Sequence, residues 1–81
     1  MSSDKGNIME KTLKEEVGKK LKDRREQLSL TQRQVAAALG IAQPVYQRFE
    51  KGIFECSYEQ LKELCKLFDI SADYLLGLTD Y

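Results

Sequence analysis

The protein has 81 residues, of which 42% are hydrophobic and 32% are charged, with equal numbers of acidic and basic side chains and no histidine. This length suits one small domain with a modest core, and this composition excludes a disordered chain. No apolar run approaches the roughly 20 residues of a membrane-spanning helix. Because charges also occur throughout the N-terminal region, we expect a cytoplasmic protein that does not associate with a membrane.

The first predicted helix begins between Asn7 and Thr12 and ends near Ser29. Asn7 with Glu10 has the spacing of a capping box, while Gly18 weakens the middle of this helix. Mainly apolar residues at spacings of three and four form a narrow apolar stripe on one face of the helix. This stripe consists of Leu13, Val17, Leu21, Arg25 and Leu28. We expect residues 1–9 to be a flexible segment and residues 10–81 to form one domain.

Two short helices follow. A capping box at Thr31 opens the second helix, and Gly40 ends it as a left-handed cap can. The third helix begins at Gln43 or Pro44, since proline suits the first turn of a helix, and it runs to Lys51. A short turn that contains glycine holds two such helices at a steep angle.

The angle between these helices calls for a small side chain where they cross. Ala36 lies where the second helix would meet the third, and a larger side chain there would force the helix axes apart. Apolar side chains around this position would bury the corner against the first and fourth helices. These side chains are Val35, Leu39, Ile41, Tyr46 and Phe49.

The remaining residues predict two further helices. Ser57 with Gln60 caps the fourth helix, and Ser71 opens a short fifth helix that runs through Leu76 to Gly77. One face of the fourth helix carries Leu61, Leu64, Cys65 and Phe68. No segment alternates with period two for long enough to be a strand, so the predicted fold is all-α.

These elements resemble the helix-turn-helix of phage repressors and Cro, the XRE-like family. Five residues fall at the spacings of that family: Gln32, Ala36, Gly40, Ile41 and Phe49. The resemblance extends from Val17 in the first helix to the SADYLLG stretch in the fifth. It implies a compact five-helix domain of the lambda-repressor type that binds DNA.

The third helix carries side chains that suit the DNA major groove. There glutamine can pair with adenine, arginine with guanine, and an apolar group can meet the thymine methyl. We expect the base contacts to come from Gln43, Pro44, Gln47 and Arg48. The alternative is that these are ordinary polar surface residues. The predicted corner and the family resemblance favour base reading.

Three residues near this helix are predicted phosphate contacts. Gln32 begins the second helix, where its side chain and the helix N-terminus can hold a phosphate. The resemblance further implies that Gln32 braces Gln43. Arg33 and Lys51 flank the same surface, and the alternative for both is a solvated charge. The resemblance also implies an ion pair between Arg25, on the apolar stripe, and Glu50; the alternative is two exposed charges.

Charge is divided unevenly along the chain. Residues 1–51 hold 11 Lys or Arg and 7 Asp or Glu, whereas residues 52–81 hold 2 and 6. The predicted DNA-reading segment therefore belongs to the basic half. On charge alone, an accidental asymmetry of a solvated surface is the favoured explanation of this division.

An enzyme is the least favoured function. There is no histidine, no metal-ligand cluster and no Gly-rich phosphate loop, so we expect no catalytic site, metal, cofactor or small-molecule substrate. Cys56 and Cys65 are expected to be reduced thiols.

The favoured function is a sequence-specific DNA-binding transcriptional regulator, expected to be a repressor. It would bind a two-fold symmetric double-stranded DNA operator as a homodimer, with some of Leu75, Leu78 and Tyr81 at the interface. The alternative is a protein-binding module, such as an antitoxin or a regulatory partner, that uses the same scaffold and meets its partner through residues 52–81. The length fits a stand-alone regulator or one with a further C-terminal domain.

Overall fold

The computed structural model describes residues 12–79, which form five helices and no strand. In chain order these are α1 (Leu13–Gln27), α2 (Gln32–Leu39), α3 (Gln43–Glu50), α4 (Tyr58–Phe68) and α5 (Ala72–Leu75). The predicted all-α fold is therefore confirmed. Three expectations concern residues outside the described range: the flexible segment over residues 1–9, the capping box of Asn7 with Glu10, and a role of Tyr81 at a dimer interface.

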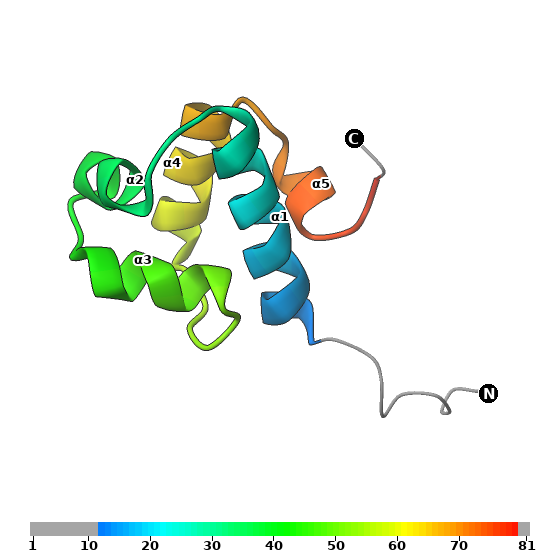
Figure 1. The fold of residues 1–81 in the computed structure, drawn as a ribbon. Coiled ribbons are helices and arrows are strands. Elements are labelled where there is room, and N and C mark those ends of the chain that lie inside the picture. Colours follow the sequence, from blue (N-terminus) through cyan, green and yellow to red (C-terminus); the bar gives the residue numbers. More distant parts are fainter. Residues whose placement is uncertain (1–11, 80–81) are drawn as a thin grey trace.

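The five helices form two groups around the long first helix (Figure 1). The pair α2 and α3 lies on one side of α1 and α4, while α5 lies on the other side. Helix α3 contacts both α1 and α2, and α5 contacts α1 and α4. Within the part of the chain that the structure describes, no helix is long and apolar enough to cross a membrane.

Side-chain caps fix where most of the helices begin. The predicted capping boxes at Thr31 and Ser57 are present, and a third at Thr12 opens α1. In the α2 box, the Thr31 hydroxyl accepts from the Gln34 backbone N–H at 3.0 Å, and the Gln34 side chain accepts from the Thr31 N–H at 2.8 Å. Helix α3 begins after Ala42 without a side-chain cap. Proline in its first turn removes one of the N–H groups that a cap would satisfy.

The core lies between the five helices, each of which contributes at least one buried side chain. Its buried hydrophobic side chains are Leu21, Val35, Ala36, Tyr46, Phe49, Leu64, Phe68 and Leu75. Ala36 is only 2% exposed, so the predicted small residue of the corner is packed on all sides. The burial of Leu75 assigns it to this core and removes it from the residues expected at a dimer interface, whereas Leu78 is 71% exposed.

Gly18 marks the closest approach of α1 to the end of α3. A Cβ atom at this position would lie 2.4 Å from the carbonyl oxygen of Phe49 and 2.5 Å from that of Glu50. Any side chain here would therefore push the two helices apart. The sequence showed only the cost of this glycine to helix α1, whereas the structure shows that it allows the two helices to touch.

Candidate nucleic-acid interface

One side of α3 remains outside the core. On its inner side Tyr46, Phe49 and Glu50 are buried. The four residues predicted to contact bases lie on the outer side, where Pro44 and Arg48 are exposed and Gln43 and Gln47 are half-buried. Two of the predicted phosphate contacts, Arg33 on α2 and Lys51 at the end of α3, are exposed.

A bidentate ion pair fastens the end of α3 to α1. The Arg25 Nε donates to Glu50 Oε2 at 2.6 Å, and its Nη2 donates to Oε1 at 3.1 Å. The side chains of Arg25 and Glu50 are only 11% and 3% exposed. A third donor, Arg25 Nη1, binds the carbonyl oxygen of Leu30 at 2.9 Å. The position of α3 is therefore fixed against both α1 and the start of the helix-turn-helix.

The ion pair keeps Glu50 ionised although it is buried. Burial by itself raises the pKa of Glu50, but hydrogen bonds from Arg25 and Gln32 bring the pKa below the ordinary value. The hydrogen bond to Glu50 is also the main reason why the pKa of Arg25 is raised. The Tyr46 hydroxyl is buried near this pair without a well-directed hydrogen bond among the described residues. Burial, followed by the neighbouring carboxylate, raises the pKa of Tyr46.

A chain of hydrogen bonds connects this ion pair to the first residue of α3. Gln32 Nε2 donates to Glu50 Oε1 at 2.9 Å, and Gln43 Nε2 donates to Gln32 Oε1 at 2.7 Å. An ionised carboxylate only accepts hydrogen bonds, so Gln32 must turn its amide N–H toward Glu50 and its carbonyl toward Gln43. The orientation of the Gln43 amide is thereby fixed. Its carbonyl oxygen and one of its N–H groups remain available.

Arg48 lies on the outer side of α3 in its last turn, where the loop that follows α3 contacts it. Its guanidinium lies over the ring of Phe54, with the carbon atom Cζ 5.4 Å from the ring centroid. Its backbone carbonyl accepts from the N–H groups of Ile53 at 3.0 Å and Phe54 at 3.3 Å. Sequence reasoning did not single out Phe54, because no helical period relates a loop residue to the helix before it.

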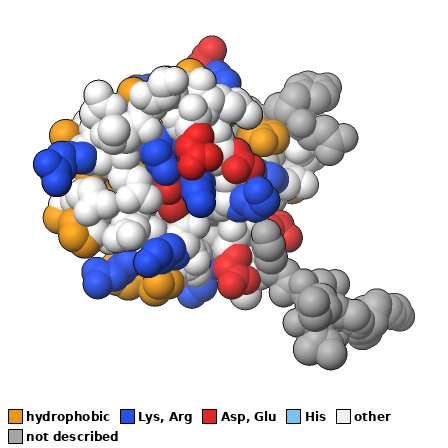
Figure 2. Space-filling model, viewed as in Figure 1, with side chains coloured by type: hydrophobic (Ala, Val, Ile, Leu, Met, Phe, Trp, Pro, Cys, Tyr) orange, Lys and Arg blue, Asp and Glu red, His pale blue; other side chains and the backbone are white. Residues whose placement is uncertain are grey.

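Basic and apolar side chains gather on this part of the surface. Figure 2 shows Lys and Arg side chains beside hydrophobic ones over α3 and the loop that follows it. In the same view, Asp and Glu side chains lie mainly toward α1. The outer side of α3 and its surroundings therefore combine basic side chains, the type that contacts phosphates in protein–DNA complexes, with amide and apolar side chains, the types that contact base edges.

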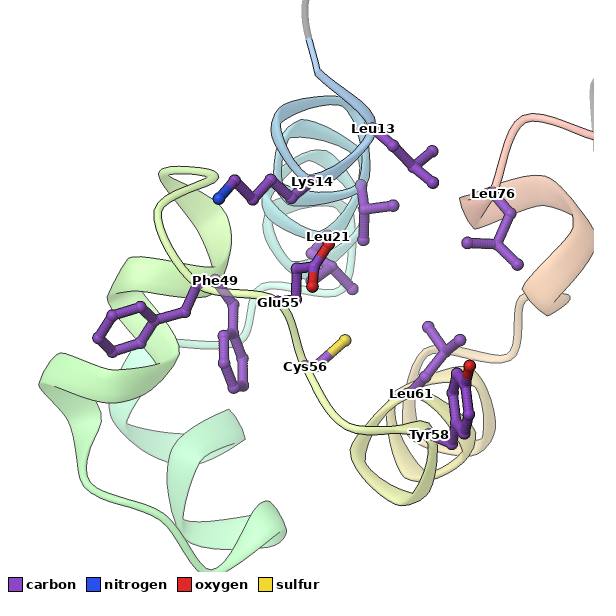
Figure 3. Close-up of a pocket in the computed structure, with 11 residues that line it drawn as sticks. Leu13, Lys14, Leu21, Phe49, Glu55, Cys56, Tyr58, Leu61 and Leu76 are labelled. Atoms are coloured by element: carbon purple, nitrogen blue, oxygen red, sulfur yellow. The ribbon is translucent and has the colours of Figure 1, made fainter.

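A second feature is an open, largely apolar pocket of about 290 Å³ between α1, α4, α5 and the loop before α4. Leu13 of α1 and Leu76 at the end of α5 line it, and the thiol of Cys56 points into it (Figure 3). Burial raises the pKa of this thiol, and neither Cys56 nor Cys65 forms a disulfide within the described residues. In that part of the chain, no group of three or more His, Cys, Asp or Glu could hold a metal ion.

Known proteins are similar to this chain in sequence and in fold. The family model for the helix-turn-helix matches residues 21–75. The HTH-type transcriptional regulator YqaE of Bacillus subtilis (strain 168) is 43% identical over 56 residues, which cover 69% of this chain and 48% of that protein. The HTH-type transcriptional regulator ImmR of the same organism is 33% identical over 61 residues, covering 75% and 48%. The chain thus spans about half the length of the curated relatives it matches.

A solved structure agrees with these relatives. The crystal structure of the clp gene regulator ClgR from C. glutamicum has a TM-score of 0.75 and 28% sequence identity, and the match covers 84% of this chain and 88% of that one. The match of the family model includes α2, α3, α4 and α5 in full. The chain belongs to the helix-turn-helix family.

Proposed function

We propose that the protein is a cytoplasmic, sequence-specific DNA-binding transcriptional regulator that reads the major groove with α3. The observation that carries this proposal is the hydrogen-bond chain from the buried Arg25–Glu50 pair through Gln32 to Gln43. Through this chain, the buried carboxylate of Glu50 fixes the orientation of the Gln43 side chain at the start of α3. Such preorganisation favours recognition of a base edge over loose attraction to a polyanion.

The groups left free on α3 match the edges of base pairs in the major groove. Gln43 retains a carbonyl oxygen and an N–H, which are the acceptor and the donor that adenine N6 and N7 require. Arg48 lies one turn beyond Pro44 on the outer side of α3 and can donate to guanine. Pro44 offers an apolar surface for a thymine methyl, and Gln47 offers a second amide between them.

The surroundings of α3 suit the phosphate backbone. Arg33 and Lys51 are exposed charges near either end of the helix-turn-helix. The side chain of Gln32 is held by Glu50 and Gln43, so its contribution to a phosphate contact would come from its second amide N–H and from the N-terminus of α2. These contacts carry no sequence information but set the register of α3 on the duplex.

We further propose that the regulator represses transcription and binds a two-fold symmetric operator as a homodimer. The resemblance to phage repressors supports repression. Apolar side chains left at the surface support a dimer, among them Leu78 and, at the rim of the pocket, Leu13 and Tyr58, which is 91% exposed. Sedimentation of the free protein and of the protein on its preferred DNA should detect the dimer. A monomer in both samples would rule it out.

Selection of bound sequences from a random DNA pool tests the main proposal. We expect a preferred site in which Arg48→Ala costs about 1 to 3 kcal/mol of binding free energy and relaxes the preference at one base position per half-site. Lys51→Ala should weaken binding to all sequences alike and reduce the salt dependence by about one unit per protomer.

Two outcomes would count against this assignment. If Arg48→Ala lowers the affinity equally for every sequence, Arg48 is a phosphate contact and the reading of bases must rest on Gln43 and Gln47. If the selection returns no preferred site and neither variant changes binding at any salt concentration, the protein is a protein-binding module instead.

A further inference from the structure

The loop after α3 folds back onto the helix at one residue. Two consecutive backbone N–H groups, those of Ile53 and Phe54, donate to the carbonyl oxygen of Arg48. The ring of Phe54 then lies under the guanidinium of the same arginine. Both the main chain and the side chain of Arg48 are thus contacted by one short segment.

This contact restrains the arginine without occupying its hydrogen-bond donors. The guanidinium of Arg48 makes no hydrogen bond or ion pair with another residue of the range 12–79. An aromatic face attracts the cation through its quadrupole and accepts none of the directed hydrogen bonds that guanine would accept. The ring therefore limits where the side chain can go, while the N–H groups stay free.

Restraint of this kind matters for a long side chain. A free arginine loses rotamer freedom when it binds a base edge, and a contact made before binding removes part of that loss. Phe54 is 42% exposed and lines the pocket beneath the loop, and its backbone N–H donates to the Arg48 carbonyl oxygen at 3.3 Å, which keeps the ring next to this arginine. The guanidinium therefore has a favoured position next to the ring before DNA binds.

We propose that Phe54 is a positioning residue for base recognition, which holds the Arg48 guanidinium at the edge of α3 and thereby sharpens the preference for guanine. This inference rests on the proposed function, because it assumes that Arg48 reads a base. It extends the recognition surface from α3 to the following loop, and it assigns an aromatic side chain a role in specificity without contact to DNA.

The test measures the affinity of variants for DNA sites that differ only at the base position read by Arg48. This is the position at which the parent shows a base preference that Arg48→Ala lacks. Phe54→Leu removes the ring but keeps an apolar side chain, and Phe54→Tyr keeps the ring. Ile53→Ala is the matched control, since Ile53 is a neighbouring exposed apolar residue without the ring contact. Urea unfolding measures the stability of each variant, and binding is measured only under conditions in which all variants are folded. Phe54→Gln repeats the test if the leucine variant is unstable.

We expect Phe54→Leu to lower the affinity for the guanine site about two- to fivefold, the value of an exposed cation–π contact. Its affinity for sites with another base at that position should not change, and Phe54→Tyr and Ile53→Ala should behave as the parent does. In an Arg48→Ala background, Phe54→Leu should have no further effect, because the partner of the ring is then absent.

Three results would overturn the inference while leaving the proposed function intact. They are an unchanged guanine preference in Phe54→Leu, an equal loss on all sites, and the same loss with and without Arg48. A gain of affinity in Phe54→Leu would also overturn the inference, because the ring would then hold Arg48 away from DNA. If the parent protein itself selects no preferred sequence, the proposed function fails and this inference fails with it.

Discussion

Replacement of Gly18 by alanine sets two effects of known sign against each other. In a helix interior, alanine is more favourable than glycine by about 0.8 to 1.0 kcal/mol, so the sequence of α1 alone predicts a more stable protein. In the folded structure the added Cβ would lie 2.4 Å and 2.5 Å from the carbonyl oxygens of Phe49 and Glu50. The tertiary contact therefore predicts the opposite result.

The clash should win. Ordinary contact distances require the two helices to separate by roughly 1 Å, and the obstructing atoms are backbone atoms at the end of a packed helix, which cannot rotate away. Overpacking of this kind typically costs 1 to 3 kcal/mol, occasionally more. We expect the high end of that range, since the same separation also pulls Glu50 away from Arg25. After subtraction of the helix gain, Gly18→Ala should destabilise the protein by about 2 kcal/mol, which lowers Tm by roughly 8 to 16 °C.

Urea unfolding followed by circular dichroism measures this difference. The control is the pair Lys22→Gly and Lys22→Ala, because Lys22 is an exposed residue of the same helix. At this position alanine should be the more stable of the two by about 1 kcal/mol. If Gly18→Ala is as stable as the parent or more stable, α1 and the end of α3 do not approach each other as closely as the structure indicates.

Two further predictions concern the corner and the ion pair. Ala36→Leu should destabilise the protein by about 1 to 3 kcal/mol through overpacking, and unchanged thermal stability would show that Ala36 does not lie at the crossing of α2 and α3. The folded-state pKa of Glu50 is lowered, so its contribution is complete above the unfolded pKa of about 4.3 and is lost as the pH falls through the lower folded value. Urea unfolding should therefore depend less on pH below about 4.3 in Glu50→Gln than in the parent, and parallel curves would contradict the role of this carboxylate.

The positions of the helices could be predicted from the sequence because the forces that set them are local. The capping boxes at Thr31 and Ser57 join residues three positions apart. The left-handed conformation of Gly40, with φ of 71°, ends α2 at the predicted residue. The outer side of α3 was likewise predictable, since spacing along a helix decides which side chains share a face.

The orientation of those side chains, by contrast, depends on contacts between residues far apart in the chain. Arg25 and Glu50 are separated by 25 positions, and only the resemblance to a family indicated that they pair. The orientation of the Gln43 amide depends on that pair, and nothing in the sequence of α3 fixes it. Gly18 resembles a defect in a helix until the helix that it touches is known. A pattern records what each segment can form alone, whereas close packing and directed hydrogen bonds arise only when the segments meet.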